Sequence, residues 1–252
     1  MSTLQNMPFV VFLTSLIVLG ISVQIGGLCS KSRPVKEEER EDLGLVTSSS
    51  LTLLALIIGF SFSMAVGRYD QRKNYEEEEA NAIGTEYVRA DLLPAADAAT
   101  VRQLLIQYLD QRVLFYTTRD LNHLNQINGE TAALQNKMWA IAQAAANKQP
   151  TPVSALAVAG MNDVLNRQGY TQAAWLNRIP TGAWCLMAAI AICCSLLIGY
   201  GARQRGILLY TILPILVSIA FFLIADIDSP RRGVIRVSPQ NLISLAQSLH
   251  SQ

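Results

Sequence analysis

An uncharged segment that runs on into a long polar segment without a helix breaker is the feature that most restricts the fold of this sequence. Residues 51–67 carry no charge and are long enough to cross a bilayer as a helix. Beyond them there is no proline until Pro94 and a single glycine, Gly84. The sequence therefore predicts one helix that begins near Thr47, where hydroxyl side chains can cap it, and that extends well past the membrane. About 46 residues at 1.5 Å each span roughly 69 Å, more than twice the ~30 Å hydrocarbon core.

Three further uncharged segments are long enough to span a bilayer: Pro8–Leu28, Gly182–Tyr200 and Ile207–Ala225. The first is predicted to be retained, because no lysine or arginine precedes it and it exceeds the apolar core of about 7–15 residues in a cleaved signal peptide. A tight turn at 201–206 is predicted to join the last two spans as a hairpin, and Pro214 is predicted to bend the fourth. The fold class is therefore an all-α membrane protein with four transmembrane helices.

Between the second and third spans, helical spacing of apolar residues predicts a domain of about 110 residues outside the membrane. Its expected helices after the long one are Ala95–Leu124, Thr131–Asn147 and Val153–Arg167, separated by breaks that include Asn128-Gly129 and ended by Gly169. The charged connector Lys31–Asp42 is expected to be a solvated loop. After the fourth span we expect a short extended piece at Val234–Val237 and a small helix from Pro239. The expected division is 1–67 for the first two spans and their connector, 68–178 for the all-helical extramembrane domain, 179–228 for the last two spans, and 229–252 for the tail.

The residues that could carry chemistry do not form a catalytic pattern. The sequence has two histidines, a net charge of +1, no glycine-rich phosphate loop and no metal-ligand spacing. We therefore expect no enzyme activity, no cofactor, no metal and no nucleic-acid partner. Glu76 to Glu79 point around most of a helix, so they are interpreted as a solvated or inter-subunit salt-bridged surface with Arg72 and Lys73 as partners. Asp226 and Asp228, beside two arginines at a membrane exit, are predicted to anchor or pair.

Two sets of residues recur at every fourth position within the second span. Small residues at Gly59, Ser63 and Gly67 are typical of close helix packing in lipid. A second stripe contains Thr52, Leu56 and Phe60, and its spacing alone is consistent with either packing or a pore lining.

Segments of the sequence resemble a known family. The motifs GFSFSMA, EEANAIGTEYVRADLLP and DSPRRGVIRVS are similar to those of a bacterial family of bestrophin-like membrane proteins of unassigned function. The stretch from Ala55 to Arg72 also resembles the second transmembrane helix of bestrophin channels, through its Gly59-Phe60 pair. Unlike bestrophins, this sequence has no tandem tryptophans after that helix and no acidic calcium clasp in its tail, so calcium gating is not implied.

The resemblance implies a homo-oligomer, with a pentamer favoured, in which Thr52, Leu56 and Phe60 line a narrow hydrophobic neck. It implies an ion channel for small inorganic ions, most simply anions such as chloride, in the bacterial inner membrane. The alternative is a non-conducting scaffold or regulatory protein that binds a partner through its helical domain. Positive residues are nearly balanced between the two sides of the membrane. The expected orientation places the helical domain and both termini in the cytoplasm.

Overall fold

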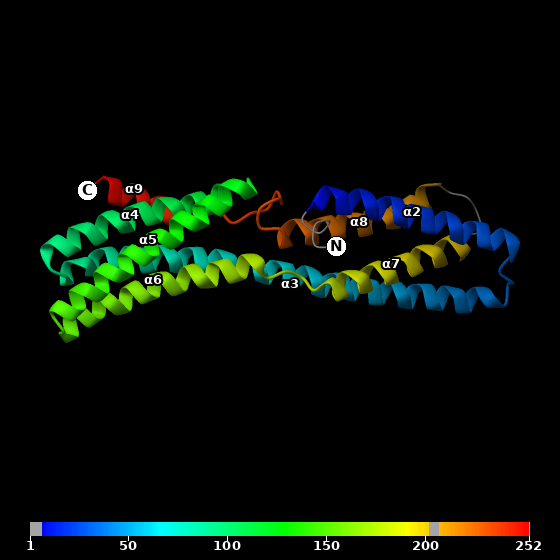
Figure 1. Cartoon of the computed structure of the whole chain (residues 1–252). Coiled ribbons are helices and arrows are strands. Elements are labelled where there is room, and N and C mark those ends of the chain that lie inside the picture. The colour runs from blue at the N-terminus through cyan, green and yellow to red at the C-terminus, as the bar shows by residue number, and fades with distance from the viewer. Residues whose placement is uncertain (1–6, 202–206, 252) are drawn as a thin grey trace. The chain divides into compact units, whose positions relative to one another are not determined.

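The computed structural model describes residues 7–201 and 207–251, and within these residues the regular structure is helical with no strand (Figure 1). The helices are α2 (Pro8–Ser32), α3 (Glu39–Arg89), the 3-10 turn η1 (Ala90–Leu92), α4 (Ala95–Thr117), α5 (Leu121–Lys148), α6 (Pro152–Leu176), α7 (Thr181–Gly201), α8 (Ile207–Asp228) and α9 (Gln240–His250). Four helices are long and apolar enough to cross a membrane, as predicted, and they contain the four expected spans. The predicted turn at 201–206 lies almost wholly outside the described residues.

Helix α3 is a single element of 51 residues and confirms the predicted uninterrupted helix. Its expected start near Thr47 was wrong, because the helix begins at Glu39, inside the segment predicted to be a loop. Three acidic residues in its first turn interact favourably with the positive end of the helix dipole and explain this earlier start. The hydroxyl of Ser48 does not cap the helix but donates to the carbonyl of Leu45, one turn back.

Two predicted breaks in the helical domain are absent. Helix α5 continues through Asn128-Gly129, and α6 continues through Gly169. A glycine inside a helix costs about 1 kcal/mol, which burial of the neighbouring Ile127 side chain offsets. The break actually lies before Leu121, where the carboxylate of Asp120 accepts the N–H of Asn122 and caps α5.

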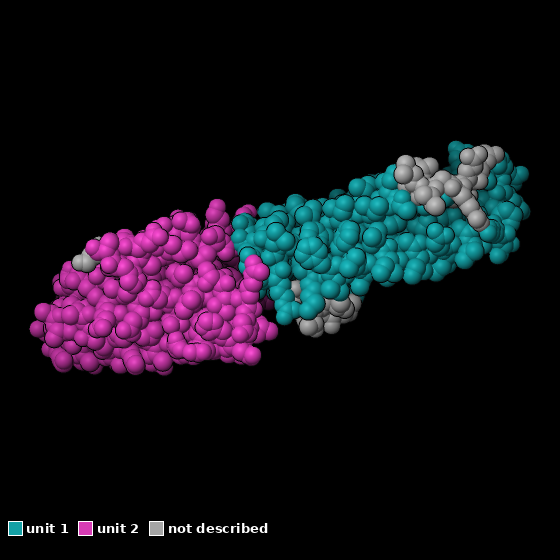
Figure 2. Space-filling view, turned by 90° about the horizontal axis from the view of Figure 1, so that it is seen from above, with its two compact units in different colours: residues 1–69, 178–236 teal, residues 70–177, 237–252 magenta. Residues whose placement is uncertain are grey.

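The chain forms two compact units, coloured separately in Figure 2. Unit 1 comprises residues 1–69 and 178–236, and unit 2 comprises residues 70–177 and 237–252. In unit 1, α2 packs against α7 and α8. The core of unit 1 is apolar, with Leu19, Leu54, Met187 and Ile224 among its buried members. Helix α8 continues through Pro214, the proline expected inside the last span.

Helices α2 and α7 approach closely at two glycines that the sequence analysis did not single out. A Cβ atom built on Gly26 would overlap the carbonyl oxygen of Leu196, and one built on Gly199 would overlap the carbonyl oxygen of Val23. Small residues allow such backbone contact, which is a major source of packing energy in a membrane. The sequence alone hardly distinguishes these two glycines as contact points, because other glycines lie near each of them along the chain.

We expect Gly26→Ala to lower the thermal stability of the purified protein, because the methyl group cannot be placed without separating α2 from α7. Overpacking of this kind typically costs about 1–3 kcal/mol. Gly20→Ala on the same helix is the matched control, since a Cβ there meets nothing within 4 Å. The melting temperature in detergent measures the effect, and equal shifts for the two variants would contradict the packing argument.

In unit 2, α4 packs against α5, α5 against α6, and α9 against α4. The core is apolar around Val101, Leu105, Met138 and Val164, which are fully buried. An aromatic cluster adds to it, because the Trp175 ring lies 4.9 Å from Phe115 and 5.2 Å from Tyr116 between centroids.

This core also contains charged groups, which corrects the prediction of a solvated glutamate surface. Glu79 is fully buried and its carboxylate pairs with the buried guanidinium of Arg112 on α4. The same carboxylate accepts hydrogen bonds from Thr171 at 3.0 Å and from Tyr116 at 3.4 Å. Burial raises the pKa of the Tyr116 hydroxyl, so it stays a donor. Four consecutive glutamates gave no sign of this, because their partners come from helices distant in sequence.

Glu76 is buried by a different partner, the C-terminal helix. Its carboxylate accepts the backbone N–H of Leu242 at 2.9 Å and the side-chain amide of Asn241 at 2.7 Å. These groups lie at the start of α9, where free N–H groups favour an anion. Glu76 therefore fixes α9 to α3 within unit 2.

Arg112→Met should destabilise the protein strongly, because it leaves the Glu79 carboxylate buried without its countercharge. The expected cost is about 3–5 kcal/mol, seen as a lower melting temperature of the purified protein. Arg40→Met is the control, since Arg40 pairs with a mostly exposed glutamate, Glu37, and should contribute at most about 1 kcal/mol. A small shift for Arg112→Met would show that Glu79 is not held by this ion pair.

Candidate pore helix

The membrane-spanning part of α3 is the span that its own protomer covers least. Only 6% of its apolar window is buried, against 22% for α2 and 44% for α8. An apolar helix that its own chain does not cover must be covered by lipid or by other subunits. The uncovered surface of α3 is therefore the candidate functional surface of this span.

One face of this span does pack within unit 1. Leu54, Ser61 and Ala65 are buried, and at about 100° per residue they lie within roughly 20° of one line along the helix. Arg68, one turn further, pairs with Asp228 of α8, its Nη1 atom 3.4 Å from Oδ1. This face attaches α3 to the rest of its protomer.

The predicted neck residues lie on the opposite face. Measured from Leu54, Thr52, Leu56 and Phe60 fall at about 160°, 200° and 240° around the helix. All three are exposed in the protomer, and Phe60 and Leu56 retain 62% and 52% of their accessible surface. The hydroxyl of Thr52 donates to the carbonyl of Ser48 at 2.9 Å, so its polar group is satisfied within the helix. The stripe is therefore largely apolar despite its threonine.

The small residues predicted for helix packing lie on this same face. Gly59, Ser63 and Gly67 fall at about 140°, 180° and 220° from Leu54, and all three are exposed. A Cβ on either glycine would meet nothing within 4 Å in the protomer. Close packing at these positions therefore stays a prediction about neighbouring subunits. The two stripes form one continuous exposed face.

Two buried aspartates at the C-terminal end of α8 connect the helices of unit 1 at the end where α3 continues into unit 2. Asp228 accepts the backbone N–H of Ile179 at 3.2 Å, in addition to pairing with Arg68. The carboxylate of Asp226 accepts the backbone N–H groups of Val234 and Ile235 at 2.7 and 2.8 Å. Asp228 thus forms an ion pair and Asp226 anchors the segment after α8, which agrees with the prediction that these aspartates anchor or pair.

A glycine completes this turn and explains part of the DSPRRGVIRVS motif. A Cβ on Gly233 would overlap the carbonyl oxygen of Asp226. Val234–Val237, expected to be extended, lies in the non-helical segment between α8 and α9 and forms no strand. The sequence shows only that Gly233 follows Asp226 by seven residues. This spacing does not by itself indicate that the Asp226 carboxylate binds main-chain N–H groups.

Within residues 7–201 and 207–251, no three His, Cys, Asp or Glu side chains are grouped so that they could hold a metal ion. His250 lies 3.6 Å from the carboxylate of Asp110 on the surface of unit 2.

Comparison with known proteins places this arrangement in a family. Two solved structures of a bacterial bestrophin homologue from Klebsiella pneumoniae, one carrying a single substitution, each give a TM-score of 0.65 at 13% identity. The matches cover 95% of this chain and 98% and 97% of those chains. A third solved structure, described as a membrane protein, gives a TM-score of 0.64 at 12% identity and covers 97% of both chains. These likenesses establish a shared fold.

No curated protein gives a significant match. The family model described as the Bestrophin-like domain matches residues 12–242, which is most of the chain. This integral membrane protein therefore belongs to the Bestrophin-like domain family.

Proposed function

We propose that the protein is a homo-oligomeric ion channel whose constriction is formed by α3. The observation that carries the proposal is the exposed face of α3, which lies opposite the face that packs on its own protomer. Rotational symmetry can bring such a face from every subunit to a common axis, because cyclic oligomers present the same surface around one axis. The bestrophin resemblance favours a pentamer in a lipid bilayer.

The neck would be formed by Thr52, Leu56 and Phe60, one ring per helical turn. Successive rings would lie about 6 Å apart along α3. A ring of phenylalanines is a hydrophobic constriction, which controls ion flow by excluding water rather than by binding the ion. Gly59, Ser63 and Gly67, on the same exposed face, are proposed to let the α3 helices of neighbouring subunits approach closely.

Anions, chloride among them, are proposed as the conducted ions because the sequence resembles bestrophin channels. A specific observation favours cations as a second candidate. Asp70, Asn74 and Glu77 are exposed and continue the same face of α3, at about 140–200° from Leu54. Arg68 and Arg72 instead fall on the opposite face, and Arg72 is buried. Acidic rings at a pore entrance attract cations.

Phe60→Ala is expected to raise single-channel conductance several-fold in planar bilayers while leaving the oligomer intact, because it removes the ring that excludes water. Phe62→Ala is the matched control, since Phe62 is also exposed but lies about 80° from Leu54, off the proposed pore face. Current and oligomer size are measured on the same preparations. Loss of assembly in Phe60→Ala, with no current from any of the proteins, would reject the channel in favour of the non-conducting scaffold.

Glu77→Gln tests the ion class. If the acidic side chains face the pore, neutralising Glu77 should shift the reversal potential in a salt gradient away from the cation equilibrium potential. Glu130→Gln, on the exposed surface of α5 and away from α3, is the control. A wild-type reversal potential at the chloride equilibrium value, unchanged by Glu77→Gln, would establish the anion channel and exclude the cation alternative.

The membrane orientation is proposed with the function. We propose that the chain lies in the bacterial inner membrane with unit 2 and both termini in the cytoplasm. The near balance of positive residues on the two sides means that this orientation is best tested directly, by labelling single cysteines placed in unit 2 in intact cells.

A further inference from the structure

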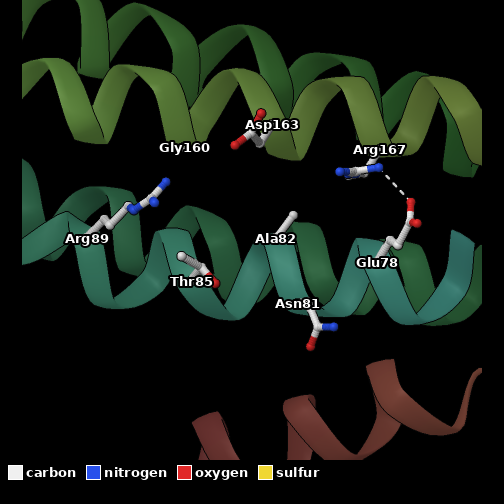
Figure 3. Close-up of a pocket in the computed structure, with 8 residues that line it drawn as sticks. All are labelled: Glu78, Asn81, Ala82, Thr85, Arg89, Gly160, Asp163 and Arg167. Carbon is white, nitrogen blue, oxygen red and sulfur yellow. Dashed lines mark hydrogen bonds and ion pairs between the residues drawn. The ribbon is translucent and has the colours of Figure 1, made fainter.

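Unit 2 contains a cavity of about 310 Å³ between α3 and α6 (Figure 3). A volume of this size is at the lower end of the range for small-molecule sites. Its lining is unusually polar, with two arginines, two acids, an amide and a hydroxyl among eight residues. The lining residues are Glu78, Asn81, Ala82, Thr85 and Arg89 of α3, and Gly160, Asp163 and Arg167 of α6.

The two arginines of the cavity are in different states. Arg167 pairs with Glu78, with 2.6 Å between Nη1 and Oε2, as the dashed line in Figure 3 marks. Arg89 has neither a hydrogen bond nor an ion pair within 4.0 Å among the residues that the structure describes, although it interacts electrostatically with Glu86. Because this half-buried guanidinium has five N–H donors and no close acceptor, it is suited to bind a ligand that supplies acceptor oxygens.

A second polar group beside the cavity has no hydrogen-bond partner. Glu86 is fully buried, and in the described part of the chain neither of its carboxyl oxygens has one. Its Oε2 atom lies against Gly160, where a Cβ would overlap it and would come within 2.8 Å of Arg89 Nη1. Gly160 is therefore the point at which the Glu86 carboxyl, the Arg89 guanidinium and the cavity wall meet.

The protonation state of Glu86 follows from this position. Burial raises the pKa of its carboxyl to about 8; Arg89 on α3 opposes the shift, and Asp163 on α6 adds to it. At neutral pH the group is mostly an uncharged acid with one O–H donor. Arg89 then lacks a fully charged neighbour at Glu86, which leaves its guanidinium able to bind an anion from the cavity.

We propose that this cavity binds a small oxyanion, a carboxylate or a phosphate-like group, held by the Arg89 guanidinium. Arginine presents parallel N–H donors that match two oxygens of such a group. The charge of Arg167 is already balanced by Glu78, so it forms a side of the cavity rather than the main contact. A metal cation is disfavoured, because the described residues group no three ligands suited to one.

This arrangement makes anion binding dependent on pH. An ionised Glu86 repels the anion and competes for Arg89, so affinity is greatest while Glu86 is protonated and falls as pH rises through about 8. For one linked proton the loss between pH 6.5 and pH 9 is about tenfold. This pH dependence of anion binding is expected whether or not the protein conducts ions.

The test is a calorimetric titration of the purified full-length protein with sulfate and, separately, with acetate, at pH 6.5 and pH 9 and constant ionic strength. Sulfate stands for the phosphate-like group and acetate for the carboxylate, and neither changes charge over this range. The expected result is about tenfold weaker binding of at least one anion at pH 9, and the anion that binds identifies the class of ligand. No binding of either anion at pH 6.5, or tighter binding at pH 9, would overturn the proposal.

Three variants separate the roles of the two groups. Glu86→Gln keeps a donor and cannot ionise, so it should bind the anion equally at both pH values. Arg89→Gln should lose binding, and Arg89→Lys, which keeps the charge without the paired donors, should weaken it. Arg119→Gln, on the exposed surface, is the control and should bind as the wild type does. A wild-type pH dependence in Glu86→Gln, or wild-type affinity in Arg89→Gln with an unchanged melting temperature, would reject the assignment.

Discussion

The structure depends on what α3 buries at each point along its length. In unit 1 it buries apolar and small groups, including Leu54 and Ala65, which need no polar partner. In unit 2 it buries carboxyl groups, which are costly to remove from water unless other helices supply donors. Arg112 from α4 and the first N–H groups of α9 supply them to Glu79 and Glu76. The helical packing of unit 2 is therefore specified by charge as well as by apolar contact.

Much of the fold could be predicted from the sequence, for physical reasons that apply to membranes. A helix is the only open structure that satisfies its backbone in lipid, so uncharged runs of sufficient length identified all four spans. The errors arose where local signals competed with tertiary contacts. Gly129 and Gly169 are turn formers in isolation, yet both lie inside helices that bury one face, with Thr131 close to the first and Thr171 close to the second. The burial of Glu79 depends on Arg112 and Thr171, which no local pattern could associate with it.

The candidate neck stays a prediction. Repetition at every fourth residue placed Thr52, Leu56 and Phe60 on one stripe, and the structure adds that this stripe is exposed opposite the packed face. We predicted Gly59, Ser63 and Gly67 as a separate packing surface, although the helix brings both sets onto a single exposed face. The sequence did not show this, because the buried and the exposed faces of α3 contain the same apolar and small residue types, so composition alone does not distinguish one face from the other.

The contact between α2 and α7 has a consequence for motion. With Gly26 against the backbone of α7 and Gly199 against that of α2, neither helix can slide or rotate past the other without separating main chains already in contact. Packed elements of this kind move as rigid bodies rather than deforming continuously. Movements of the spans in unit 1 are therefore expected to leave the α2–α7 pair intact and to take place at its boundary with other helices.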